Sequence, residues 1–175
     1  MGARRRPDRS KQAREGSAAV EFALVAAPFF FMLFALLEVG LIFTLDSTLE
    51  SAVMQTSRKV RTGEAARLGY TPAEFKTQMC DRMTIFAADC ENRAYVDVRE
   101  IVQFRTPEPP DPLSGGGTLN QGDMDYSNGA AASLMLVRVW YKHPVMTPMM
   151  QQMIARTTNG EAVLMAATTF RNEPF

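Results

Sequence analysis

The chain has 175 residues, enough for one compact domain, and its 19 basic side chains balance 19 acidic ones. Residues 1–16 nevertheless carry six basic and two acidic residues, which leaves a net charge of −4 on the remainder. A basic head on a mildly acidic body is typical of a membrane protein whose head stays in the cytoplasm, and it argues against a body that binds nucleic acid.

An apolar segment follows the basic head. Residues 22–37 carry no charge, and after Glu38 the apolar character continues to Leu45. A helix rises about 1.5 Å per residue, so this stretch can cross a hydrocarbon core of roughly 30 Å. A buried helix of a soluble protein can be equally apolar, but the run of phenylalanines beside a basic cluster favours a membrane span. We therefore expect residues 1–16 to be a basic leader and residues 17–45 a transmembrane anchor in a lipid bilayer.

A cleavable secretory signal and a lipid anchor are the alternatives to a retained span. The apolar core of a signal usually has about 7–15 residues and is followed by an A-x-A-like site. Here the stretch is longer, and no such site follows it. Gly2 is compatible with myristoylation, but Arg6 stands where that motif needs Ser or Thr. We therefore expect the span to be retained.

The junction between leader and span, residues 15–22, reads EGSAAVEF. It resembles the prepilin-peptidase site of the pilins and pseudopilins of the tight-adherence (Flp) pilus. In that site a Gly, the point of cleavage, four variable residues and a Glu precede Tyr or Phe, here Phe22. The resemblance implies cleavage between Gly16 and Ser17, and pairing of Glu21 with the new α-amino group of a neighbouring subunit. A carboxylate at the membrane edge is costly unless paired. The alternative is that Glu21 reaches the headgroup layer and the spacing is accidental.

Two further residues interrupt the apolar pattern of the span. Pro28 removes a backbone hydrogen bond, which a membrane helix tolerates where neighbours compensate. Glu38 lies about 24 Å along the helix from Phe22, and hence near the outer edge of the hydrocarbon. Two interpretations of Glu38 stay open: a carboxylate that reaches the headgroups, or one that binds a partner.

Beyond Leu45 the helical pattern continues but becomes amphipathic. Leu49, Val53 and Val60 share one face, and Gly63 is a plausible end. A single helix over residues 17–62 would be roughly 69 Å long, and only its first half fits within a membrane. A long helix that is an anchor in its first half and packs on a domain in its second is the pilin architecture.

The body that follows predicts two short helices and three strands. The helix starts are Thr71 with Pro72 and Thr147 with Pro148. Alternating apolar residues predict strands at 95–104, 134–142 and 163–171. We therefore expect an α+β, pilin-like fold in which the long N-terminal helix packs on a small antiparallel sheet, with residues 46–175 as a periplasmic domain.

Methionines line one side of the helix after Thr147, together with one isoleucine. They are Met149, Met150, Met153 and Ile154. Such a stripe could bind a metal or an adaptable partner, but the helical spacing favours packing into the core.

Residues 107–129 are rich in proline, glycine and polar residues, which predicts an exposed loop. Asp123 and Asp125 within it are compatible with calcium binding. The spacing nevertheless lacks the EF-hand pattern and its bidentate glutamate, so we expect a solvated loop and no metal.

Cys80 and Cys90 are the two cysteines of the chain. Beyond a membrane span, in an oxidising periplasm, such a pair predicts a disulfide, whereas in a cytosolic domain the two would be free thiols. The one histidine, His143, precedes a proline at a strand end and is expected to face solvent. No Gly-rich phosphate loop, G-x-S-x-G or H-E-x-x-H occurs, so we expect no catalytic residues, no cofactor and no enzyme activity.

The anchor and the C-terminal tail together resemble one family. Residues 16–40, GSAAVEFALVAAPFFFMLFALLEVG, resemble the anchor of TadE-like proteins, and residues 170–175, FRNEPF, resemble the tail common among their alphaproteobacterial members. The resemblance implies a minor pseudopilin that assists assembly of the Flp pilus and surface adherence. Its implied partners are a prepilin peptidase, the major Flp pilin, other TadE/TadF/TadG-like proteins and an inner-membrane secretion platform.

Two functions of different classes stay open. The first is a processed pseudopilin that leaves the bilayer during assembly. The second is an unprocessed single-span scaffold whose periplasmic domain binds pilus or secretion machinery. Both place the chain in the inner membrane with its N-terminus in the cytoplasm, and the fate of Gly16 and Glu21 distinguishes them. A periplasmic enzyme, a third class, would need an activity that survives loss of the anchor.

Overall fold

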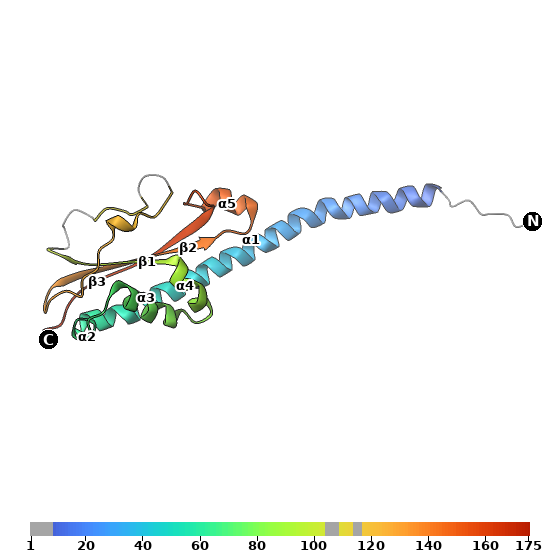
Figure 1. Ribbon diagram of the computed structural model, residues 1–175. Helices are drawn as coiled ribbons and strands as arrows, with labels where there is room; N and C mark the ends of the chain where they lie inside the picture. The colour runs from blue at the N-terminus through green and yellow to red at the C-terminus, as the bar shows by residue number, and fades with distance from the viewer. Residues whose placement is uncertain (1–8, 104–108, 114–116) are drawn as a thin grey trace, which may run out of the picture.

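A single long helix dominates the fold. The computed structural model describes residues 9–103, 109–113 and 117–175, and for residues 9–16 it describes the backbone alone. Helix α1 (Arg9–Arg61) has 53 residues and extends about 80 Å. Its C-terminal half lies along a small domain, while its N-terminal half projects away from that domain (Figure 1). The long helix expected from the sequence is confirmed, although it begins before residue 17, and Pro28 lies inside it.

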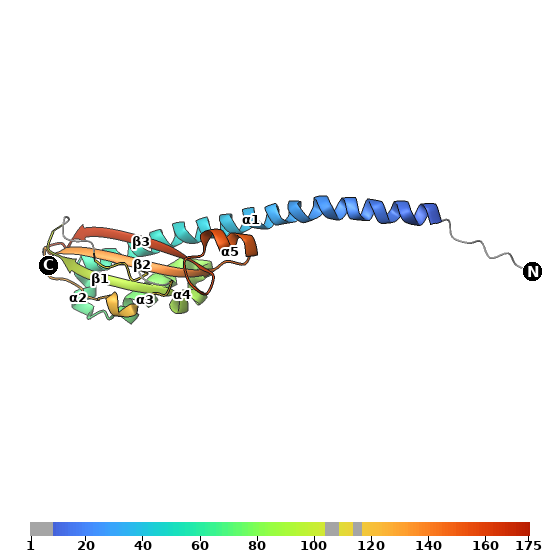
Figure 2. The same ribbon diagram turned by 90° about the horizontal axis from the view of Figure 1, so that it is seen from above.

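The domain is an antiparallel sheet of three strands with short helices on one side (Figure 2). The strands lie in the order β1-β2-β3, so β2 is central and pairs with both neighbours. The expected α+β fold is confirmed. The elements after α1 are α2 (Glu64–Leu68), α3 (Pro72–Cys80), η1 (Asp81–Phe86), α4 (Ala87–Arg93), β1 (Ala94–Ile101), η2 (Gln121–Asp123), β2 (Leu134–Pro144), α5 (Pro148–Ile154) and β3 (Glu161–Arg171).

The core lies between one face of the sheet and the helices. The predicted apolar face of α1 is confirmed, because Leu49, Val53 and Val60 are all fully buried. They belong to one cluster with Val137 of β2 and Phe75 of α3. Burying one such side chain contributes about 1.5–3 kcal/mol. The C-terminal half of α1 is therefore part of the domain and not a stalk beside it.

The predicted disulfide is present. Cys80 ends α3 and Cys90 lies in α4, with their Cα atoms 5.4 Å apart. Both cysteines are buried in the core cluster. The bridge therefore closes the compact helical turn that leads from α3 through η1 into α4, directly before β1.

Two expectations about the predicted helices and strands were wrong. The first strand ends at Ile101 rather than at residue 104, because Ile101 already pairs with Leu134, the first residue of β2. Val102 therefore leaves the sheet and is exposed, and Phe104 lies outside the described residues.

The second wrong prediction is the core packing of the methionines on α5. Met149 and Met153 are exposed. Met150 and Ile154 are half-buried, because the short helix packs against β3 with that side alone.

Candidate functional site

The projecting half of α1 presents apolar side chains to its surroundings. Phe22 is 72% exposed, and Leu24, Val25 and Phe29 are similarly open. The most apolar window of this helix has a mean hydropathy of 2.3, and none of that window is buried by the domain. An apolar surface of this extent marks a contact with a membrane or with other proteins. Within the described residues, this helix is long and apolar enough to cross a membrane, which is compatible with a single-pass anchor.

The predicted processing site lies at the start of this projecting segment. Gly16 and Ser17 are both in helical backbone. The hydroxyl of Ser17 donates a hydrogen bond to the carboxylate of Glu21, one turn further on, at 3.3 Å. Glu21 and Phe22 are both exposed. The structure therefore places the residues of the junction on adjacent turns of one exposed helix.

Glu38 does not belong to this group. It lies about 26 Å along the helix from Glu21, where α1 meets the domain, and it is 8% exposed. Its carboxylate accepts hydrogen bonds from the backbone N–H groups of Met146 and of Thr147, the latter at 3.0 Å. The sequence left open a headgroup contact or a partner for Glu38, and the structure adds a third arrangement, a bond within the same chain.

The side-chain cap that the sequence predicted at Thr147 does not form, and Glu38 bonds the backbone just before the helix. Thr147 precedes α5 as expected, but its side chain makes no capping hydrogen bond. The carboxylate of Glu38 instead accepts the N–H groups of Met146 and Thr147, the two residues that directly precede α5. The projecting half of α1 is thereby joined to α5 at the point where it leaves the domain.

His143, which the sequence predicted to face solvent, is buried close to this junction. It lies near the end of β2, three residues before Met146. Burial lowers the pKa of His143, and the positive charge of Arg93 lowers it further. The negative charge of Glu38 acts in the opposite direction, so the two groups lie within electrostatic range of each other.

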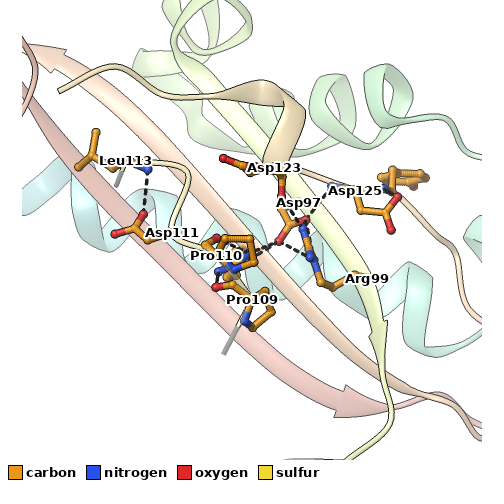
Figure 3. A network of polar contacts seen from close by, with 10 residues as sticks. Asp97, Arg99, Pro109, Pro110, Asp111, Leu113, Asp123 and Asp125 are labelled. Carbon is orange, nitrogen blue, oxygen red and sulfur yellow. Dashed lines mark hydrogen bonds and ion pairs between the residues drawn. The ribbon is translucent and has the colours of Figure 1, made fainter. Parts of the chain in front are cut away.

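A buried cluster of charged side chains lies on the face of the sheet opposite the core. Asp97 of β1 is 0% exposed, and its carboxylate accepts hydrogen bonds from Arg138 Nε at 2.8 Å and from Arg99 Nε at 2.9 Å. The backbone N–H of Asp125 donates a third, at 2.8 Å (Figure 3). Arg138 itself is buried, and the ring of Trp140 lies 4.9 Å from its guanidinium carbon.

The segment expected to be an exposed loop covers this cluster. Of residues 107–129, the structure describes 109–113 and 117–129. The guanidinium of Arg138 donates to the carbonyls of Pro109 and Pro110, at 3.2 and 3.4 Å, and the guanidinium of Arg99 donates to that of Asp123 at 2.7 Å (Figure 3). Apart from buried Pro112, the described residues of this segment are exposed or half-buried, and two arginines of the sheet fasten the segment by binding its backbone carbonyls.

The acidic residues that the sequence offered as possible calcium ligands make local hydrogen bonds. Asp123 accepts a hydrogen bond from the side chain of Asn120 at 2.9 Å, and Asp125 accepts one from the N–H of Tyr126 at 2.8 Å. Across the residues that the structure describes, no group of three or more His, Cys, Asp or Glu side chains could hold a metal ion.

The C-terminal tail of the chain is bonded to the C-terminal end of α1. Asn172 is buried and donates to the backbone carbonyls of Asn128 and Ala130, at 3.3 and 3.0 Å. The N–H of Glu173 donates to the carbonyl of Arg61, the last residue of α1, at 2.8 Å. The tail that carried part of the family resemblance therefore links the C-terminal end of α1 to the last strand of the sheet.

Comparison with known proteins identifies the N-terminal part of the chain. The family model described as TadE-like protein matches residues 16–58. This segment contains the junction, the anchor and most of the helix that packs on the sheet, whereas the three strands lie outside it. Neither the curated proteins nor the solved structures gave a match to the chain. The resemblance seen in the sequence is confirmed over residues 16–58, where the chain is similar to the TadE-like family of pilus components.

Proposed function

We propose that the chain is a minor pseudopilin of the tight-adherence pilus, anchored in the inner membrane with its domain in the periplasm. A prepilin peptidase cleaves it between Gly16 and Ser17, and the processed chain assists assembly of the fibre and hence surface adherence. The observation that carries this proposal is the TadE-like match, which begins at Gly16, the residue before the proposed cleavage.

The charge pattern supports cleavage at this position. Cutting after Gly16 removes the six basic residues of the leader and keeps the whole apolar helix. Basic residues hold a segment on the cytoplasmic side of a membrane. Without them, the anchor can be drawn out of the bilayer, as fibre assembly requires.

Glu21 supports a role for the new N-terminus. Apart from Ser17, the side chains described from residue 17 onward place no hydrogen-bond donor on its carboxylate. A carboxylate at the membrane edge is costly unless it is paired. The α-amino group of Ser17 in a neighbouring processed subunit is a cation that only cleavage creates. Contact between the exposed anchors of adjacent subunits would bring the Glu21 carboxylate and this α-amino group together. The adjacent subunits would be the major Flp pilin and related TadE/TadF/TadG-like chains.

The second candidate is an unprocessed scaffold that stays in the membrane and binds the secretion platform through its domain. It is favoured by the rigid joint at Glu38, which fixes the domain on the anchor. Both candidates have the same fold, so only the state of the N-terminus separates them.

The test is the mass and N-terminal sequence of the chain extracted from membranes of cells that make the pilus. If the chain is a pseudopilin, the mature wild-type protein begins at Ser17. The Gly16→Leu variant is not cleaved and keeps residues 1–16. Glu21→Ala is cleaved normally but lowers the number of pili, whereas Glu50→Ala, an exposed glutamate of the same helix beyond the anchor, changes neither. A wild-type chain that keeps residues 1–16 would overturn the proposal and leave the scaffold.

A further inference from the structure

Helix α5 stands at the end of the domain that faces the projecting half of α1. Both views place it beside α1 where that helix leaves the domain (Figures 1 and 2). The bonds from Met146 and Thr147 to Glu38 fix the beginning of α5 at the level of residue 38 of the anchor. Any membrane that the anchor crosses therefore has α5 as a near neighbour.

The outer side of α5 and the chain just before it carry exposed methionines and no charge. Met146, Met149 and Met153 are 79%, 60% and 79% exposed. Met149 and Met153 are one turn apart and so share a face of the helix. From residue 144 to residue 155 the chain has no charged side chain. We call these three methionines the methionine face.

The length of the anchor places the methionine face at a bilayer surface. Glu38 follows Ser17 by 21 residues, or about 31 Å of helix, and a hydrocarbon core is roughly 30 Å thick. With Ser17 at the cytoplasmic edge, the level of Glu38 and α5 coincides with the outer edge of the core. We propose that the methionine face of α5 rests in the outer interface of the bilayer that the anchor crosses. This proposal depends on the membrane anchor of the proposed function.

The lipid surface fits the methionine face better than a protein partner does, because the apolar surface of the anchor continues past it. Beyond Glu38, Leu41 is exposed and Phe43 is 73% exposed, so α1 is still apolar alongside α5. An interfacial helix buries an apolar face at the boundary between headgroups and acyl chains. The flexible, polarizable side chain of methionine adapts to irregular surroundings of this kind. Because the methionine face lies beside the apolar surface of the anchor, the same lipid bilayer is the partner that covers both.

Tryptophan fluorescence in lipid nanodiscs tests the position of α5. The full chain is reconstituted in phosphatidylcholine that carries bromine on the acyl chains, either near the glycerol or near the methyl end. Single-tryptophan variants Met149→Trp and Met153→Trp are made in a Trp140→Phe background. Phe30→Trp, in the middle of the anchor, reports on the span itself, and Met54→Trp is the matched control. Met54 is an exposed methionine of α1 about 24 Å beyond Glu38.

The expected result is that shallow bromines quench Met149→Trp and Met153→Trp more than deep bromines do, while Phe30→Trp shows the reverse order and Met54→Trp is unquenched. Quenching at position 30 without quenching at 149 and 153 would overturn the position of α5 and leave the anchor. No quenching at position 30 would instead refute the membrane anchor, on which the proposed function and the position of α5 both depend.

A measurement without substitutions guards against variants that misfold. In the unsubstituted chain labelled with ¹³C-methyl methionine, a paramagnetic headgroup lipid should broaden the methyl signals of the methionine face more than that of Met54. Equal broadening of all these signals, or broadening of none, would contradict the proposal. A second copy of the chain on this face would appear as protection that depends on protein concentration and not on the lipid, which also contradicts it.

Discussion

Replacement of Asp97 by Asn tests how much the buried ion cluster holds the domain together. The carboxylate of Asp97 is fully buried and binds Arg138, Arg99 and the N–H of Asp125. Asn has nearly the same shape as Asp but no charge. Its side-chain NH₂ group is a hydrogen-bond donor and would face N–H groups that are donors themselves. The buried guanidinium of Arg138 then has no counter-charge, although it keeps the carbonyls of Pro109 and Pro110.

The magnitude follows from burial. Removing one partner of a buried ion pair costs about 3–5 kcal/mol, because the remaining charge is left uncompensated. Arg99 is partly open to water, which can solvate it in place of Asp97, so the lower end of that range applies. A loss of about 3 kcal/mol is a large part of the roughly 5–15 kcal/mol by which a domain is stable.

The assay is urea unfolding of the full chain in detergent, followed by the emission of Trp140, whose ring lies against Arg138. With a slope of about 1–3 kcal/mol per molar urea for a small protein, the midpoint should fall by about 1–3 M. Asp89→Asn is the matched control, since Asp89 pairs with Arg93 at 3.7 Å on the surface and should cost less than about 1 kcal/mol.

Two outcomes would refute this reasoning about Asp97. The first is a midpoint for Asp97→Asn that falls no further than that of Asp89→Asn. The second concerns the double variant with Arg138→Met, which removes the orphaned charge and should recover part of the loss. A double variant as unstable as the sum of its parts would show that the two side chains do not act as a pair.

Three further perturbations have expected outcomes in the same unfolding assay. Replacing Cys80 and Cys90 together by Ala should cost about 2–3 kcal/mol, since it releases a short cross-linked loop, and chemical reduction of the wild type should match it. Gly63→Ala should cost more than Gly69→Ala: both glycines have positive φ, 73° and 67°, which costs other residues about 1–2 kcal/mol, but a Cβ at Gly63 would also meet the ring of Phe175. Equal losses at the two glycines would refute the ring contact, and Phe175→Ala should remove the difference. Because the pKa of His143 is lowered in the folded state, the unfolded chain takes up the proton first, so stability should fall as the pH drops below the ordinary value of about 6.5. His143→Gln should flatten that decline, and an unchanged slope would show that another group causes it.

Local signals predicted the elements of the fold well. Thr71 begins α3 with a capping box to Glu74, and the two residues that make this cap are only three positions apart in the chain. The strands follow from alternation, and the buried face of α1 follows from spacings of four and seven. In each case the physical cause lies within one or two turns of the residue concerned, so a single sequence contains it.

The failures share one cause, which is that periodicity shows which residues share a face but not what covers that face. Met149 and Met153 of α5 do share a face, and nothing in the described part of the chain lies over it. Arg138 lies on the polar face of β2 as its pattern indicates, yet it is buried, because residues 109–113 cross over it. Asp97 was not singled out at all, since two of its three partners come from 28 and 41 residues away.

Glu38 connects these findings to the function. Its partner in this structure is backbone 108 residues away, so no local pattern could assign it. Two hydrogen bonds tie the beginning of α5 directly to α1, since a side chain of α1 accepts both N–H groups. If assembly draws the anchor out of the bilayer, the methionine face must leave the lipid at the same moment. The neighbouring subunits of a fibre would then have to cover Met149 and Met153 as well as the anchor, or the extraction would expose apolar surface to water.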